Sequence, residues 1–160
     1  MELTLKTISK EAVPAALQKV TVYRYLHQPV EAESICRDVL AVEPENQQAI
    51  RLLGLSLTDQ FIGKKKDPYL EAERLFASLK DPYERHYLKG LLRERRAKAE
   101  LRAGQPPYNV TALLYETLKC YAEAEKIRPP GNDEAILRWN GCVRLARSRP
   151  EFEWALKDME

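Results

Sequence analysis

The chain has 160 residues, of which 44% are apolar and 31% are charged, so we expect a soluble globular protein rather than a disordered one. Its 26 basic and 24 acidic residues nearly balance, which argues against a nucleic-acid-binding protein with a dominant basic face. The 3 cysteines form no CxxC pair, so we expect neither a disulfide framework nor a zinc site.

The first residues, MELTLKTISKEA, contain no basic segment followed by an apolar one, so we expect no signal peptide. No apolar run approaches the roughly 18 residues that identify a candidate membrane-spanning helix. We therefore expect a cytoplasmic protein without a membrane partner.

Prolines separate segments of helical length, within which apolar residues recur at i, i+3 and i+4. No segment alternates strictly between apolar and polar residues, so we predict an all-α fold. The expected helices span 12–27, 30–42, 45–61, 68–79, 82–103, 108–127, 132–148 and 150–158. Short connections between them favour antiparallel neighbours.

Three of these helices have a recognisable start. Asp67-Pro68 and Asp81-Pro82 each combine a capping aspartate with a proline in the first helical position, where its missing N–H costs nothing. Asn132, which follows Pro129-Pro130-Gly131, is expected to cap the seventh helix. The lysines of Gly63–Lys66 are expected to lie at the carboxyl end of the third helix.

Residues 16–76 show a helical-hairpin repeat of about 34 residues. The first unit has an aromatic residue on its first helix, alanine and cysteine on its second, and a closing proline: Tyr23, Ala32, Cys36 and Pro44. The second unit has Ile50, Leu53, Gly54 and Leu57 on its first helix and Ala72 and Phe76 on its second. The loop 63–66 absorbs an insertion between these two helices.

Later units are more divergent. The third has Gly90 on its first helix and Tyr121, Ala124 and Pro129 at later offsets, and the fourth has Leu137, Asn140, Gly141 and Arg144. These spacings resemble those of the tetratricopeptide repeat family. The resemblance implies antiparallel helix hairpins that stack in a right-handed superhelix, or solenoid, of about seven or eight helices. It implies a single domain over 1–160, with about three helix pairs and C-terminal capping helices.

The repeat depends on close approach between helices, which glycine on the first helix and alanine on the second permit. A leucine at Gly54 should overpack this contact at a cost of about 1–3 kcal/mol. At the C-terminus, Phe152 and Leu156 share one helix face with i,i+4 spacing, beside Trp154. This segment either caps its own solenoid or occupies the groove of a second copy, which would make a homo-oligomer.

In the family, first-helix residues one turn apart line a concave groove that binds a partner. Eight positions of this chain are the resulting candidates for partner binding: Arg24, Tyr25, Arg51, Leu55, Tyr87, Arg95, Arg138 and Trp139. The same offsets include Leu17, Thr21, Gln48, Thr58, Asp59, Leu91, Glu94 and Cys142. Arginine forks suit bidentate capture of carboxylates, and aromatic rings supply anchoring area.

The resemblance implies a non-enzymatic adaptor that binds a protein or peptide in this groove. One alternative is a chaperone for a specific client, of the kind that serves bacterial type III secretion or an assembly process. A second is an RNA-associated factor that uses the basic helix 82–103, although its interleaved charges, such as Glu94 and Lys98, favour a solvent-exposed helix stabilised by ion pairs.

The sequence provides few groups for catalysis. His27 is expected near a helix end and His86 in a charged first turn, and neither belongs to an HExxH motif. No serine lies in a GxSxG elbow, and no glycine-rich phosphate loop is present. We therefore expect no catalytic residues, no metal site and no cofactor.

Overall fold

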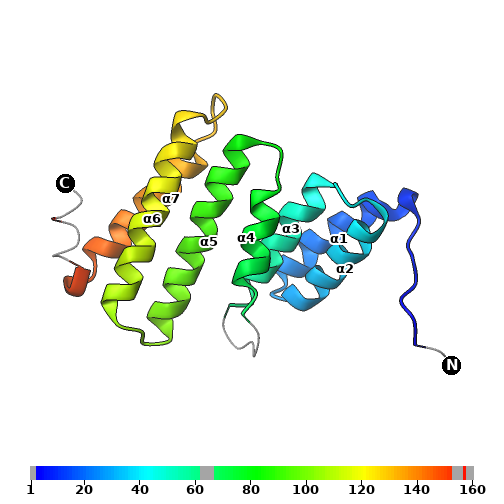
Figure 1. Ribbon diagram of the computed structural model, residues 1–160, viewed down its shortest axis with the longest axis horizontal. Helices are drawn as coiled ribbons and strands as arrows, with labels where there is room; N and C mark the ends of the chain where they lie inside the picture. Colours follow the sequence, from blue (N-terminus) through cyan, green and yellow to red (C-terminus); the bar gives the residue numbers. More distant parts are fainter. Residues whose placement is uncertain (1–2, 62–66, 153–156, 158–160) are drawn as a thin grey trace. The chain divides into compact units, whose positions relative to one another are not determined.

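The computed structural model describes residues 3–61, 67–152 and 157 (Figure 1). The described chain is helical and contains no strand, so the all-α prediction is confirmed. The helices are α1 (Val13–Tyr25), α2 (Pro29–Val42), α3 (Gln47–Thr58), α4 (Tyr69–Ala77), α5 (Pro82–Arg102), α6 (Pro107–Lys126) and α7 (Glu134–Arg147). Two short 3-10 turns, η1 (Lys10–Ala12) and η2 (Pro150–Phe152), accompany them.

Most predicted helix ends lie within a few residues of the observed ones. The largest difference concerns the helix predicted over 45–61, because α3 ends already at Thr58. It also begins only after Asn46, whose side chain accepts a hydrogen bond from the Ala49 N–H at 2.9 Å. Of the segment predicted as a helix over 150–158, the structure describes η2 and the single residue Lys157, which is helical. The lysines of Gly63–Lys66, together with Trp154 and Leu156, lie outside the described residues.

The predicted start at Asp81-Pro82 is confirmed, whereas α4 and α7 begin one residue later than the predicted caps imply, after Pro68 and after Asp133. At all three starts a side chain accepts a hydrogen bond from a backbone N–H group. Asp81 accepts from the Tyr83 N–H at 2.9 Å, and Asp67 accepts from the Tyr69 N–H at 2.9 Å. Asn132 accepts from the N–H of Glu134, the first residue of α7, at 3.1 Å. Each bond satisfies a donor that a helix start leaves without an intrahelical partner.

The chain contacts divide it into two compact units, residues 1–79 and 80–160, which we call unit 1 and unit 2. In unit 1, α1 packs on α2, α2 on α3 and α3 on α4, and α1 also contacts α3. Gly54 of α3 faces the Phe76 ring so closely that an added Cβ would lie 2.3 Å from it. The predicted need for a small residue at Gly54 is therefore confirmed.

In unit 2, α5 packs along α6 and α6 along α7, and η2 contacts both α6 and α7. A Cβ added at Gly90 would lie 2.7 Å from the Tyr121 ring, so the glycine–aromatic contact of unit 1 recurs here. Phe152 is buried with Ala97, Val110, Leu114 and Ala146, which confirms that this part of the C-terminal segment packs on its own unit.

Gly141 differs from the other two glycines of the repeat pattern. It is exposed, and nothing lies within 4 Å of the place where its Cβ would be. The pattern predicts a close helix approach at this position, and the described residues provide none. That residues 1–160 form a single repeat domain remains a prediction.

No helix in the described ranges is both long enough and apolar enough to cross a membrane.

Candidate functional site

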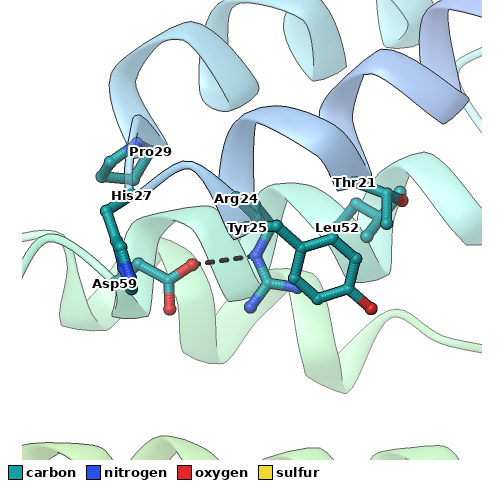
Figure 2. A pocket seen from close by; sticks show the side chains of 7 residues that line it. All are labelled: Thr21, Arg24, Tyr25, His27, Pro29, Leu52 and Asp59. Atoms are coloured by element: carbon teal, nitrogen blue, oxygen red, sulfur yellow. Dashed lines mark hydrogen bonds and ion pairs between the residues drawn. The ribbon is translucent and has the colours of Figure 1, made fainter.

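Unit 1 contains a pocket of about 380 Å³ where the end of α1, the turn to α2 and α3 meet (Figure 2). It contains two of the eight candidate residues, Arg24 and Tyr25. Its lining consists of Thr21, Arg24, Tyr25, His27, Pro29, Leu52 and Asp59. In Figure 2, His27 and Pro29 lie on one side of the Arg24–Asp59 pair, and Tyr25 and Thr21 lie on the other. Residues of α1 and α3 therefore form most of the lining.

Arg24 is held by a carboxylate of its own chain. Its Nε donates a hydrogen bond to Asp59 Oδ2 at 2.8 Å, and the two side chains are 20% and 27% exposed. The pair joins α1 to the end of α3, but an ion pair in contact with water contributes only about 0–1 kcal/mol to stability. The pair therefore orients the guanidinium more than it stabilises the unit.

His27 follows the end of α1 in an unusual backbone conformation. Its φ is +57°, the left-handed region that glycine normally occupies after a helix. The Gln28 N–H donates to the Tyr23 carbonyl at 2.9 Å, and this bond closes the turn. His27 lies just after a helix end, as the sequence predicts, and its imidazole is part of the pocket wall.

Apolar side chains on the solvent face of α1 continue from the pocket. Tyr25 is 80% exposed, and Val22 and Leu26 share its helix face and are more than half exposed. Val30, near the start of α2, is also exposed. The buried face of α1, with Val13 and Val20, lies on the other side, so α1 has apolar residues on two faces. An exposed cluster of apolar side chains beside a pocket is a candidate contact surface.

Arg51 and Leu55 lie two turns and one turn before Asp59 on the partly exposed face of α3. They extend the surface that begins at the pocket. We call the face formed by Thr21, Arg24 and Tyr25 of α1 and by Arg51, Leu55 and Asp59 of α3 the α1–α3 surface.

The candidates of unit 2 are engaged in packing. Tyr87 stacks on Tyr83 with ring centroids 5.8 Å apart and donates a hydrogen bond to Glu134 at 3.2 Å. Trp139 packs against the core of the unit, and Arg95 is partly exposed on α5.

The fourth candidate, Arg138, reaches a buried carboxylate. Glu94 is 2% exposed and accepts hydrogen bonds from the Tyr121 hydroxyl at 2.6 Å, from Lys98 Nζ at 2.5 Å and from Arg138 Nη1 at 3.4 Å. We call these four residues the Glu94 cluster. The predicted i,i+4 pair of Glu94 with Lys98 is confirmed, but the prediction of an exposed helix face is wrong at Glu94.

The ionised form of Glu94 is stabilised by its hydrogen-bond partners, although the carboxylate is buried. Burial alone would raise the pKa of this carboxyl, but the hydrogen bonds from Lys98 and Tyr121 outweigh burial and lower the pKa below its usual range. Burial also raises the pKa of Tyr121, and the neighbouring carboxylate raises it further. Glu94 therefore remains ionised and Tyr121 remains a hydrogen-bond donor.

Other residues that share the groove offsets are buried. Leu17, Thr58, Leu91 and Cys142 are each less than a tenth exposed and belong to the interior of their units. Residues on every face of a helix recur with the same spacing of three to four. A spacing that identifies groove positions therefore also matches positions on the adjacent face, which packs in the core. These residues contribute to packing and cannot contact a partner at the surface.

Reactive groups are few among the described residues. Burial raises the pKa of the Cys36 thiol and of the Cys142 thiol to about 12, so both are protonated at neutral pH. In the described chain, no three side chains of His, Cys, Asp or Glu gather in a way that could hold a metal ion.

The comparisons with known proteins add no relatives. No protein-family model, no curated protein and no solved structure matches this chain.

Proposed function

We propose that this chain is a non-enzymatic adaptor of the cytoplasm whose α1–α3 surface binds a peptide segment of a partner protein. Under this proposal its helices form antiparallel hairpins of the tetratricopeptide type, stacked as one right-handed solenoid. Repeat proteins of this build use extended surfaces to bind other proteins.

The fold part of the proposal is supported by the two glycine–aromatic contacts. Gly54 with Phe76 and Gly90 with Tyr121 join a first helix to the following second helix at positions that the repeat pattern selects. Ala32 and Cys36, the small residues of the first unit, are fully buried on α2. Consecutive helices pack on each other within each unit.

The binding part rests on one observation, the pocket of unit 1 with the exposed Tyr25 at its edge. Its volume of about 380 Å³ lies near the lower end of the ~300–1,000 Å³ range of ligand pockets. Exposed aromatic rings beside a polar pocket are typical anchors of protein interfaces. An extended peptide suits such a surface, because its side chains can enter the pocket while the chain continues along α1 and α3.

The two alternatives receive less support. Three basic residues of α5 already have partners in the chain, because Lys98 bonds to Glu94, Arg96 to Glu100 at 3.0 Å and Arg93 to the Cys120 sulfur at 3.0 Å. An RNA-binding helix would need such groups for phosphates. A chaperone for one client would use the same surface as the adaptor, and no contact in the structure favours it.

A peptide-display selection tests the proposal. A random peptide library is selected on the wild-type protein, and the enriched peptides are then measured against Tyr25→Ala and Tyr108→Ala. Tyr108 is the matched control, because it is 72% exposed on α6 of unit 2.

We expect enriched peptides to lose affinity for Tyr25→Ala by about tenfold or more, as for a truncated interface anchor, and to bind Tyr108→Ala normally. If no peptide is enriched, or if the peptides bind Tyr25→Ala as they bind the wild type, the proposal is wrong. Arg138, another candidate for partner binding, is not a suitable position for a test variant. A charge reversal there would place a second carboxylate beside the buried Glu94 and would affect the fold.

A further inference from the structure

Three polar side chains of the pocket, Arg24, Thr21 and Tyr25, have hydrogen-bond donors that no other described residue uses. Arg24 uses Nε for Asp59, and its two terminal amino groups make no hydrogen bond to another described residue. The hydroxyls of Thr21 and Tyr25 likewise make none within the described residues. Figure 2 shows the guanidinium between Asp59 on one side and the Tyr25 ring on the other. A site rich in donors is suited to a ligand rich in acceptors.

The Asp59 contact makes the end of the guanidinium available. Because Nε is occupied at 2.8 Å, the remaining Nη1 and Nη2 form a two-pronged donor, the geometry that binds both oxygens of a carboxylate. Asp59 also fixes the orientation of Arg24, which reduces the conformational entropy that binding would cost. Asp59 therefore preorganises the Arg24 guanidinium for binding an anion.

The chemistry of a peptide segment determines which anion the Arg24 fork can meet. Carboxylates are the anionic side chains of an unmodified protein segment, and their two oxygens match the two terminal amino groups of a guanidinium. A phosphate group, with a charge of about −1.5 to −2, would be attracted more strongly by Arg24 and repelled more strongly by Asp59, so inorganic phosphate is a competing ligand that the experiment must include.

We propose that the pocket receives the side-chain carboxylate of an acidic residue that is flanked by apolar residues in the partner segment. This inference rests on the proposed function, since it names the chemistry of the segment that the adaptor binds. The flanking residues are apolar because Tyr25, Val22 and Leu26 lie exposed on the helix that presents Arg24. The segment continues beyond the carboxylate on both sides, along α1 and α3.

Titration with short blocked peptides, followed by NMR, tests the inference. The probes are acetyl-Leu-Glu-Phe-amide, the same peptide with glutamine, the glutamine peptide with a free carboxyl terminus, and inorganic phosphate. We expect the glutamate peptide to shift the backbone resonances of 21–29 and 52–59. It should bind about tenfold more tightly than the glutamine peptide, as one charge-assisted pair implies.

Two variants assign the effect to Arg24. Arg24→Gln should bind the two blocked peptides equally, and Arg24→Lys should retain only part of the preference because it keeps the charge and loses the fork. Arg128→Gln is the matched control: Arg128 also donates through Nε to an aspartate, Asp133, at 3.2 Å, but in unit 2. Backbone spectra of each variant show whether the fold is kept.

Several results would overturn the inference. These are equal affinities of the glutamate and glutamine peptides, an unchanged preference in Arg24→Gln, or tighter binding of phosphate or of the free carboxyl terminus. Binding at 21–29 and 52–59 without a preference for glutamate would contradict the carboxylate site and leave the adaptor proposal intact. Absence of peptide shifts, together with a failed display selection, would contradict both.

Discussion

Units 1 and 2 both contain a contact between a helical glycine and an aromatic ring of another helix, but the ring has a hydroxyl group only in unit 2. In unit 1 the aromatic ring that packs on the first-helix glycine, Gly54, belongs to Phe76, and in unit 2 the ring that packs on Gly90 belongs to Tyr121. The tyrosine hydroxyl is buried and needs a partner, which Glu94 provides at 2.6 Å. The buried carboxylate in turn requires cations, and Lys98 and Arg138 supply them.

The consequence is a different use of arginine in the two units. Arg138 is engaged with a buried carboxylate and serves the interior of unit 2, whereas Arg24 pairs with Asp59 at the surface of unit 1 and keeps donors available to a pocket. The same residue type thus stabilises one unit and provides a candidate binding site in the other. Stability measurements can test this distinction, since buried and exposed pairs differ in energy.

The largest effect is expected for Glu94→Ala. The change leaves the Tyr121 hydroxyl buried without an acceptor and removes the partner of two cations, so we expect a loss of roughly 2–4 kcal/mol in the free energy of unfolding. Both tryptophans, Trp139 and Trp154, belong to residues 80–160, so urea unfolding followed by tryptophan fluorescence reports on unit 2. A loss below 1 kcal/mol would show that the Glu94 cluster contributes little, and that the two units do not differ as described.

Filling the glycine contacts should affect both units. In Gly54→Ala and Gly90→Ala the new methyl group meets an aromatic ring at 2.3 Å and 2.7 Å, and we expect each change to cost about 1–3 kcal/mol. Circular dichroism during urea unfolding follows both units, and tryptophan fluorescence follows unit 2.

Gly141→Ala is the control for these two variants, because its methyl group enters open space on α7. Replacement of an exposed helical glycine by alanine should stabilise the protein by up to about 1 kcal/mol. If Gly141→Ala destabilised the protein as much as Gly54→Ala, packing against the Phe76 ring would not explain the loss in Gly54→Ala.

The sequence allowed the helices and these contacts to be predicted, because they depend on local pattern. Proline and aspartate identify helix starts, and the spacing of Gly54 and Phe76 identifies a close approach. The partners of Arg24 and Arg138 could not be predicted in this way. Each partner is on another helix, and the pairing depends on how far the helices are rotated and shifted against each other, which a one-dimensional pattern does not contain.

Glu94 and His27 differ in whether the sequence contains information about their structural role. Glu94 lies one turn after Gly90 on α5, the face that packs on α6, so its burial could have been inferred from the glycine. The left-handed backbone conformation of His27 could not be inferred from the sequence, because a residue in this conformation after a helix is normally glycine or asparagine.

A smaller effect is expected from the pH dependence of the Glu94 cluster. Glu94→Gln keeps hydrogen-bonding atoms but removes the charge, so we expect a loss of about 1 kcal/mol at neutral pH. Because the pKa of Glu94 is lowered in the folded state, its contribution is complete above the unfolded value of about 4.3 and disappears as the pH falls through the folded value. The difference between wild type and variant, measured by urea unfolding from neutral to acidic pH, should therefore shrink below pH ~4. A constant difference would mean that the charge of Glu94 does not stabilise the fold.

The smallest effect is expected for Asp59→Ala, which breaks the exposed pair with Arg24. Both side chains are in contact with water in the wild type, and Arg24 can be hydrated when Asp59 is removed, so the free energy of unfolding should fall by less than about 1 kcal/mol. If the pair serves to orient Arg24 for a carboxylate ligand, the same variant should weaken binding of acetyl-Leu-Glu-Phe-amide while its urea midpoint hardly moves, because the guanidinium is no longer held in place. A variant that unfolds as easily as Glu94→Ala would show instead that Arg24 and Asp59 form a structural pair, and the contrast between the two units would disappear.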